Sequence, residues 1–309
     1  RQLLTTFMAA ILLWWMVNWR PQLRISSRHA KDLLTFGLNM TGTNIVGFLG
    51  KRSDELLIGY FLGPTSLGYY HVGRRLVYVM TEFLGQTVNN VAWPAFARLQ
   101  DNPIRLREGF YRATAGISFL AFPATLGVYA VSPELVKIFF GDQWIQCIPI
   151  VQILVFLGLI QVLMLLQESV VVGMGKPQWR FGLRLAIGLI CIAGFFLTFH
   201  WGIVAIAFAY MLINLLFVPL SLYLVGCLIP ISYVNYVSCC KGPIISSIIM
   251  FITILITKTW TIDMNVHIEL IILGTVGVFS YLLTIQFISP MFINEFKNTI
   301  RTITRPSNI

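Results

Sequence analysis

Charged residues inside apolar stretches are the residues of this sequence that could do chemistry. Lys51-Arg52-Ser53-Asp54-Glu55 interrupts one apolar stretch, and Arg74, Arg75 and Glu82 occur in the next. A charged side chain in the middle of a bilayer costs about 2.5–3.5 kcal/mol on insertion scales. Such residues persist where they face a water-filled cavity, a partner charge or a charged ligand. The predicted substrate-binding residues are Arg75, Arg52, Lys51, Arg74, Asp54 and Glu82.

The polar residues 51–55 have two interpretations that differ in what surrounds them. If 33–62 is one helix, it is about 45 Å long and overruns a hydrocarbon core of about 30 Å, which places residues 51–55 in its outer half. They then either line a cavity or lie at the membrane interface, where Glu55 would pair with Lys51 and Arg52 at helical spacing. Seven further apolar residues follow Glu55 and favour the cavity.

The two consecutive arginines of the next apolar stretch point to different sides of the predicted helix. Arg74 and Arg75 lie about 100° apart around a helix and cannot point the same way, whereas Glu82 follows Arg75 by two turns on the same face. The planar fork of arginine matches phosphate oxygens, so a basic lining would suit a lipid-linked pyrophosphate. Glu168 and Arg184, near the ends of later stretches, are weaker candidates, because simple snorkelling to the interface would explain them.

The amino-acid composition shows whether these charges are in a soluble protein or in a membrane protein. Of 309 residues, 57% are hydrophobic and 11% are charged. Soluble domains have about 25% charged residues, so a soluble enzyme, a nucleic-acid-binding protein and a disordered chain are excluded. The chain is an integral membrane protein. Its five cysteines are scattered without a CxxC pair, and no catalytic residue, metal site or cofactor is predicted.

Nine segments are long and apolar enough to cross a bilayer as helices, which predicts an all-α membrane helix bundle. The predicted spans are 3–19, 33–62, 70–97, 113–131, 148–172, 182–200, 203–226, 243–260 and 268–289. Short turn-rich segments separate them, such as Gly63-Pro64-Thr65-Ser66. The mixed-charge segment 98–112 is expected to form a short amphipathic helix at the membrane surface.

The basic residues predict the orientation of the bundle. If every predicted span crosses, 15 of the 22 lysines and arginines lie in loops and a tail on one side. These segments are 20–32, 98–112, 173–184, 227–242 and 290–309. The opposite loops contain only Lys137 and Lys258. The bias places the first set in the cytoplasm, the C-terminus inside and the N-terminal end outside. The net charge of +10 therefore reflects topology and does not indicate nucleic-acid binding.

Four sequence blocks resemble the Wzx-type polysaccharide flippases, which belong to the multidrug/oligosaccharidyl-lipid/polysaccharide exporter superfamily. Residues 53–63 and 67–76 are similar to the family pattern D-x-x-LIG-x-x-LG…LG-x-Y-x-x-x-x-RL. Residues 94–101 and the block Phe139-Phe140-Gly141-Asp142-Gln143-Trp144 are similar to two more family blocks. The subgroup that the chain resembles is the colanic-acid-exporter type. From residue 181 onward the resemblance is limited to hydropathy and the number of spans.

The resemblance implies fourteen helices in two lobes around a central cavity, and a chain that lacks five N-terminal helices. The expected organisation is the last helix of the N-terminal lobe at 1–19, a cytoplasmic loop at 20–32, a six-helix lobe at 33–226, two additional helices at 227–289 and a cytoplasmic tail at 290–309. By resemblance, Arg75 takes the arginine of the "RL" block and Asp54 takes the acidic position of the first block.

The function implied by the resemblance is transport without bond-making. The expected substrate is an undecaprenyl-pyrophosphate-linked oligosaccharide repeat unit, carried across the bacterial inner membrane by alternating access. A polysaccharide polymerase and a chain-length regulator are the expected protein partners. A membrane enzyme acting on polyprenyl-linked sugars is the alternative, disfavoured by short external loops and few carboxylates. A drug or cation antiporter is disfavoured by the basic cavity.

Overall fold

The structure, a computed structural model, describes residues 2–16, 54–261 and 264–288. The chain divides into two compact units, residues 1–51 and residues 52–309. In the first unit the described residues form α1 (Gln2–Met16), an apolar helix with exposed large side chains. Lys51 and Arg52, two of the predicted substrate-binding residues, lie outside the described residues.

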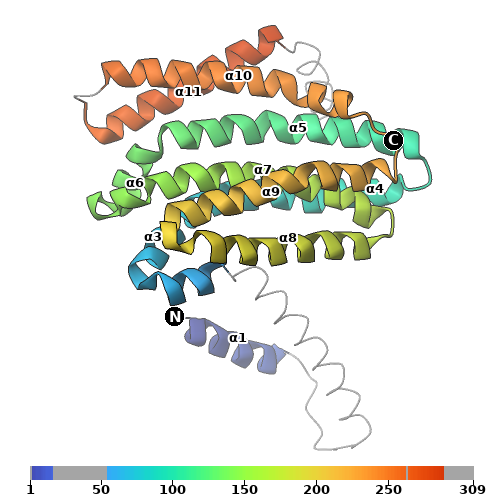
Figure 1. The fold of residues 1–309 in the computed structure, drawn as a ribbon, viewed down its shortest axis with the longest axis horizontal. Coiled ribbons are helices and arrows are strands. Elements are labelled where there is room, and N and C mark those ends of the chain that lie inside the picture. The colour runs from blue at the N-terminus through green and yellow to red at the C-terminus, as the bar shows by residue number, and fades with distance from the viewer. Residues whose placement is uncertain (1, 17–53, 262–263, 289–309) are drawn as a thin grey trace, which may run out of the picture. The chain divides into compact units, whose positions relative to one another are not determined.

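The second unit is a bundle of long helices (Figure 1). After a helical segment at 54–61, its elements are α3 (Gly63–Thr87), the π-helical turn η1 (Val88–Ala92), α4 (Trp93–Arg98), α5 (Pro103–Ala130), α6 (Ser132–Phe140), the 3₁₀ turn η2 (Asp142–Cys147), α7 (Ile148–Gly173), α8 (Pro177–Thr198), the 3₁₀ turn η3 (Phe199–Trp201), α9 (Ile203–Gly226), α10 (Tyr233–Trp260) and α11 (Val266–Ile288). The described residues contain no strand, and the predicted all-α helix bundle is confirmed.

Six helices of the described residues are long and apolar enough to cross a membrane. They correspond to α5, α7 with η2, α8 with η3, α9, α10 and α11. The predicted span 33–62 falls mostly outside the described residues, and the predicted span 70–97 corresponds to α3, η1 and α4, which are too polar to be counted among the six. The number of nine spans stays a prediction.

The helix α7 forms the centre of the bundle. Its sequence is apolar on all sides, which is typical of a helix surrounded by other helices. It contacts α3, α4, α5, α8 and α9, and Ile150, Val155 and Val170 on it are fully buried. At Gly73 of α3 an added Cβ would lie 3.1 Å from Ile150, so the glycine lets the two helices approach closely. Among the described helices, α3 therefore packs mainly on α7.

The last two helices pack on α5 and on each other. At Gly277 of α11 an added Cβ would lie 2.9 Å from Ile254 of α10, so this glycine permits the close contact between the two helices. Lys258 of α10 lies 2.7 Å from Glu134 of α6, with its Nζ and the carboxylate Oε1 facing each other. The same Nζ donates to the carbonyl oxygen of Ala130 at 3.3 Å. Polar contacts thus join α10 to α5 and α6 at one end of the bundle.

Two predicted connections are helical in the structure. Gly63-Pro64-Thr65-Ser66 was expected to be a turn, but α3 begins at Gly63, and only Leu62 separates it from the preceding helical segment. Gly63 has φ +83°, a backbone conformation that glycine adopts without strain. Pro64 is suited to the first turn of α3, because backbone N–H groups in the first turn have no partner within the helix and proline lacks this group.

The prediction of a separate surface helix at 98–112 was wrong. Residues 103–112 are the first turns of α5, which begins at Pro103 and continues to Ala130. The side chain of Asn102 accepts a hydrogen bond from the backbone N–H of Arg105 at 3.1 Å and so caps the helix. Leu106 and Phe110 are fully buried in the bundle. The basic segment is helical because its apolar positions continue the packing of the membrane helix.

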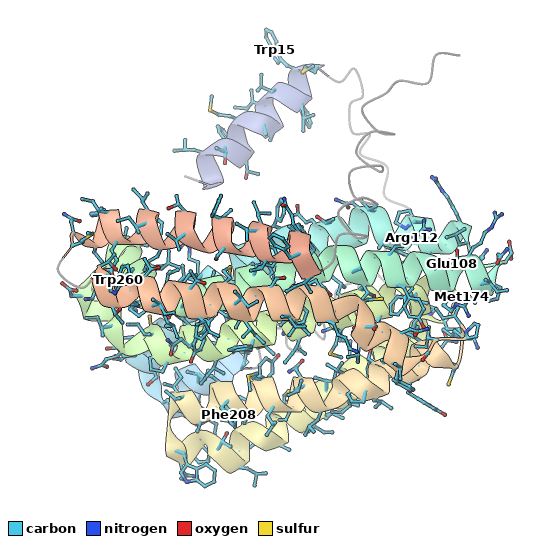
Figure 2. The ribbon with its side chains drawn as sticks, turned by 90° about the horizontal axis from the view of Figure 1, so that it is seen from above. Trp15, Glu108, Arg112, Met174, Phe208 and Trp260 are labelled. Carbon is cyan, nitrogen blue, oxygen red and sulfur yellow. The ribbon has the colours of Figure 1, made fainter. Side chains whose placement is uncertain are left out.

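The connections that carry most of the basic residues lie together at one end of the bundle. Figure 1 shows the α4–α5, α7–α8 and α9–α10 connections at this end, and the α8–α9 and α10–α11 connections at the other. In Figure 2, Glu108, Arg112 and Met174 accordingly lie at the opposite end from Trp260. Among the described residues of the bundle, Lys137 and Lys258 belong to the end that carries few cations.

Candidate functional site

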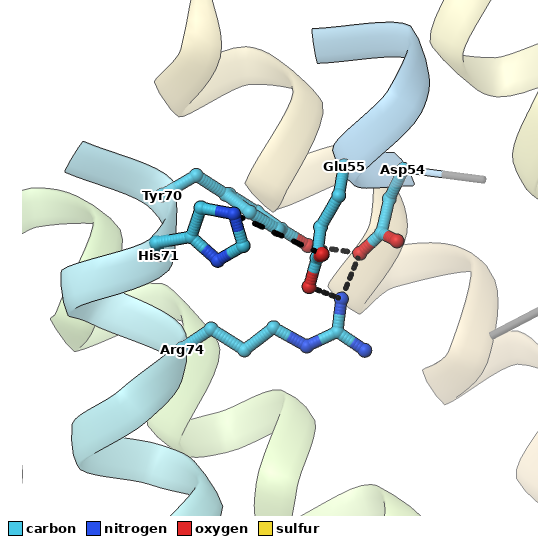
Figure 3. Close-up of polar contacts among 5 residues, drawn as sticks. All are labelled: Asp54, Glu55, Tyr70, His71 and Arg74. Carbon is cyan, nitrogen blue, oxygen red and sulfur yellow. Dashed lines mark hydrogen bonds and ion pairs between the residues drawn. The ribbon is translucent and has the colours of Figure 1, made fainter. Parts of the chain in front are cut away.

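A cluster of polar and ionisable side chains lies where the helical segment 54–61 runs back along α3 (Figure 3). Oδ2 of Asp54 accepts hydrogen bonds from the hydroxyl of Tyr70 at 2.6 Å and from Nη1 of Arg74 at 2.8 Å. The same Nη1 donates to Oε1 of Glu55 at 3.0 Å. Nε2 of His71 lies 3.8 Å from Oε2 of Glu55. We call these five residues the Asp54 cluster.

The Asp54 cluster is largely shielded from the surroundings. Asp54 and Tyr70 are buried, and the Arg74 side chain is 35% exposed. Burying a carboxylate is costly unless a cation and hydrogen bonds compensate it, and Arg74 and Tyr70 provide both. The structure thus brings the predicted residues Asp54 and Arg74 together, and Nη1 of Arg74 is engaged with Oδ2 of Asp54 and Oε1 of Glu55.

A small pocket adjoins the buried carboxylate of Asp54. It is lined mainly by apolar side chains of α8 and α9, including Phe195 and Ile206, together with Tyr210. The space open to the centre of a water-sized sphere is about 20 Å³, which is enough for about one water molecule. A sugar does not fit into it, so the pocket is not a binding site for an oligosaccharide.

The outward face of α3 is polar. Arg75, Tyr78, Glu82 and Gln86 are all exposed, and Nε2 of Gln86 donates to Oε1 of Glu82 at 2.9 Å. At 100° per residue these four positions lie within about 80° of the helix circumference. We call them the α3 polar face.

The opposite side of α3 is apolar. Val77 and Leu84, together with Val88 at the start of η1, are buried in the core of the bundle. One helix therefore presents a packed apolar face to α7 and an exposed polar face to its surroundings. The predicted residues Arg75 and Glu82 share this exposed face, as their spacing of seven indicated.

Two residues predicted as weaker candidates also meet. Glu168 of α7 is buried and lies against Arg184 of α8, whose Nε is 2.6 Å from Oε1. Arg180 also contacts Glu168, with its Nε donating to Oε2 at 3.0 Å. Arg180, and Tyr70 and His71 of the Asp54 cluster, were not among the predicted site residues. The spacing of four between Arg180 and Arg184 was the available signal for a shared helix face.

The described residues show no arrangement for metal binding. Among them, no group of three or more His, Cys, Asp or Glu side chains could hold a metal ion. Their cysteines are free thiols, and three of the five are buried.

Comparison with known proteins shows that the chain is similar to proteins of polysaccharide biosynthesis. Residues 1–149 match the family described as polysaccharide biosynthesis protein. The teichuronic acid biosynthesis protein TuaB of Bacillus subtilis is 31% identical over 201 residues, which cover 62% of this chain and 42% of TuaB. The lipopolysaccharide biosynthesis protein WzxC of Escherichia coli is 32% identical over 143 residues, which cover 46% of this chain and 29% of WzxC. The predicted resemblance to the Wzx-type family is confirmed.

The fold comparison agrees with the sequence comparison. The lipid II flippase MurJ, solved in its inward closed conformation, superposes with a TM-score of 0.71 at 13% sequence identity. The superposition covers 88% of this chain and 57% of MurJ. At this identity the match shows a shared fold. The chain spans less than half the length of TuaB and of WzxC.

Proposed function

We propose that this chain is part of a flippase that moves undecaprenyl-pyrophosphate-linked oligosaccharide repeat units across the bacterial inner membrane, from the cytoplasm to the periplasm. The α3 polar face forms one wall of the substrate cavity, and the lobes of the intact protein rock to give alternating access. The observation that carries the proposal is the exposure of Arg75 and Glu82 on a helix whose opposite face is packed into a membrane bundle.

Lipid is an unfavourable neighbour for the α3 polar face. An arginine or a glutamate that faces hydrocarbon costs about 2.5–3.5 kcal/mol on insertion scales, and polar residues in membrane helices face cavities or other protein groups. Arg75 forms no ion pair with any of the described residues, so its guanidinium can bind the pyrophosphate of the substrate. Glu82 and Gln86 offer acceptors and a donor for sugar hydroxyl groups.

The relatives support the substrate class. The names of TuaB and WzxC refer to teichuronic acid and lipopolysaccharide biosynthesis, and MurJ is a flippase of lipid II. Teichuronic acid and lipopolysaccharide are sugar polymers of the cell envelope, and lipid II carries sugars on a lipid. By this analogy the ligand of the α3 polar face is a lipid-linked sugar, and a polysaccharide polymerase and a chain-length regulator are the proposed partners.

The positive-inside rule supplies the orientation. The end of the bundle that carries Arg105, Arg112, Lys176 and Arg180 faces the cytoplasm in this proposal, and the end with Lys137 faces the periplasm. The C-terminus is then cytoplasmic and the N-terminal end of the chain is periplasmic.

A transport function without bond-making fits the state of three of the four buried carboxylates among the described residues. Asp54, Glu134 and Glu168 each contact a lysine or an arginine, and Glu269 accepts a hydrogen bond from the hydroxyl of Thr261. A carboxylate held by a cation is a poor general base, because the ion pair stabilises the charged form. The alternative of a membrane enzyme would require a less constrained acid–base pair.

The test is a transport measurement on the intact protein. Arg75→Ala is expected to reduce surface polysaccharide at unchanged protein level, and to weaken substrate binding about tenfold or more through the loss of a charge-assisted contact. Arg52→Ala is expected to act in the same direction. Arg112→Ala removes an exposed arginine of α5, outside the α3 polar face, and is the matched control. Flipping is followed in proteoliposomes with a fluorescent lipid-linked oligosaccharide.

Three results would overturn the proposal. Normal polysaccharide output from both Arg75→Ala and Arg52→Ala would remove the cavity assignment. Bond formation or cleavage in the lipid-linked substrate by the purified protein would favour the enzyme. A change in drug susceptibility at unchanged polysaccharide output would favour the antiporter.

A further inference from the structure

A second ion cluster lies far along the chain from the α3 polar face, at the end of the bundle where α7 leads into α8. It consists of Glu168, Arg180 and Arg184, and we call it the Glu168 cluster. The Glu168 side chain is 1% exposed, whereas the Arg180 and Arg184 side chains are 41% and 42% exposed. A buried carboxylate therefore holds two arginines that both reach the surface.

The charges of the Glu168 cluster do not balance. Two guanidinium groups share one carboxylate, so one positive charge is in excess. Lys176, one turn before Arg180, adds a further cation and lies over the ring of Trp179 at 4.4 Å from its centroid. The first turn of α8 contains no acidic residue, and a helix N-terminus itself favours an anion. All of these charges attract an anion to the same place.

The arginines also keep unused donors. Nη2 of Arg184 donates to Oε2 of Glu168 and its Nε lies 2.6 Å from Oε1, whereas Arg180 donates only through its Nε. Within the part of the chain that the structure describes, no acceptor is hydrogen-bonded to either Nη of Arg180 or to Nη1 of Arg184. Because Glu168 fixes both guanidinium groups, these donors are pre-organised for a phosphate at little entropic cost.

An apolar stripe follows directly beside the arginines. Phe181, Leu185 and Leu189 each come four residues apart, and all three are well exposed. Around α8, Phe181 lies about 100° from Arg180, Leu185 about 100° from Arg184, and Leu189 about 140° from Arg184. The opposite side of α8 is packed in the bundle through Leu183 and Ile187. The surface thus offers phosphate donors at the helix start and a strip for an acyl chain along the helix.

We propose that Arg180 and Arg184, positioned by Glu168, bind the phosphate group of an anionic phospholipid of the surrounding membrane, with an acyl chain along Phe181, Leu185 and Leu189. The end of the bundle with most of the basic residues is where such lipids are concentrated if it faces the cytoplasm. The excess positive charge selects an anionic headgroup over a zwitterionic one.

The proposal is tested by lipid binding to the intact protein in detergent, measured by native mass spectrometry. Phosphatidylglycerol and phosphatidylethanolamine with identical acyl chains are titrated separately. We expect tighter binding of phosphatidylglycerol to the wild type, and about tenfold weaker binding after Arg180→Gln, from the loss of a hydrogen bond to a charged group. Arg112→Gln removes an exposed arginine outside the cluster and should leave binding within about twofold.

The variants are chosen so that the fold survives. Arg180→Gln leaves Arg184 in contact with both oxygens of Glu168, and Arg184→Gln leaves Arg180 in place, so the buried carboxylate always keeps one cation. Arg180→Lys keeps the charge but loses the planar fork, and should give an intermediate affinity. It also serves as the test variant if either glutamine variant is unstable.

Three results would overturn the proposal. Equal affinity of wild type and Arg180→Gln for phosphatidylglycerol would show that the arginines are structural only. Equal affinity for the two phospholipids would exclude an anion-selective site. Displacement of phosphatidylglycerol by a polyprenyl pyrophosphate in the wild type but not in Arg180→Gln would assign the cluster to the transported substrate. The measurement involves no transport, so its outcome is independent of the proposed function.

Discussion

The Asp54 cluster and the Glu168 cluster are built from the same kinds of side chain in opposite proportion. In the first, one arginine lies between two carboxylates, and its Nη1 contacts both of them. In the second, one carboxylate lies between two arginines, and several donors are left over. The comparison shows that a charge inside a membrane protein indicates a ligand only when its own neighbours do not satisfy it. Two arginines of similar appearance in the sequence, Arg74 and Arg180, therefore have different proposed roles.

The largest expected effect is the loss of the guanidinium from the Asp54 cluster. Arg74→Met should lower the free energy of unfolding by about 3–5 kcal/mol, because it removes the cation from a buried carboxylate. Unfolding by denaturant in detergent micelles measures the change. The neighbouring Arg75→Met is the control, with an expected change within about 0.5 kcal/mol, since Arg75 is exposed. Equal losses for both variants would contradict the separation of the two arginines into a structural and a binding residue.

Single losses from the Glu168 cluster should be smaller, because one arginine always remains. Arg184→Met should cost about 2 kcal/mol and Arg180→Met about 1 kcal/mol, in the order of the contacts that each makes with Glu168. The double variant leaves a buried carboxylate without its two cations and should cost more than the sum of the two single changes. Additive losses in the same unfolding experiment would show that the two arginines act independently.

The hydroxyl of Tyr70 provides a smaller test of the Asp54 cluster. Tyr70→Phe removes the 2.6 Å hydrogen bond to Asp54 and keeps the ring, so we expect a loss of about 1 kcal/mol in stability. Tyr69→Phe is the adjacent control, because Tyr69 contributes a ring contact to Trp144 that phenylalanine preserves. A loss as large as that of Arg74→Met would show that the hydroxyl, and not the cation, holds the cluster together.

The smallest effect is expected at the edge of the same cluster. His71 is 49% exposed and lies 3.8 Å from Glu55, a geometry in which an ion pair contributes little. His71→Gln should therefore change the unfolding free energy by less than about 0.5 kcal/mol. A larger loss would make His71 a full member of the cluster and would sharpen the contrast with the Glu168 cluster, which contains no histidine.

Hydropathy predicted the apolar lengths of the helices well and their polar ends poorly. The predicted span 203–226 coincides with α9, and 148–172 nearly coincides with α7. By contrast, α10 begins at Tyr233, ten residues before the predicted span 243–260. Its first turns contain Ser238 and Lys241, which lower the hydropathy without ending the helix. A helix continues beyond the bilayer wherever tertiary contacts support it, and hydropathy does not report such contacts.

The sequence predicted which charged residues belong to the candidate site, but it did not predict which of them contact each other. The angle between consecutive helical residues separated Arg74 from Arg75, and the structure shows one of them in a cluster and the other exposed. Which of the two meets Asp54 depends on how the segment 54–61 folds back at Leu62, and no spacing rule gives that register. Glu168 and Arg180 also meet only through the short connection between α7 and α8. Partners in different helices are set by tertiary packing, so the sequence identified the charges and not their contacts.

Hydrogen bonds attach the last two helices, α10 and α11, to α5, so these helices are expected to move with it. Tyr281 of α11 donates to the carbonyl oxygen of Phe119 in α5 at 2.7 Å, and the backbone N–H of Ser232, just before α10, donates to the hydroxyl of Tyr111 at 2.7 Å. With the contact between Lys258 and Glu134, α10 and α11 are attached at several depths. A tilt of α5 must carry both helices with it, so the perimeter that the protein presents to neighbouring lipids would change in step with its interior.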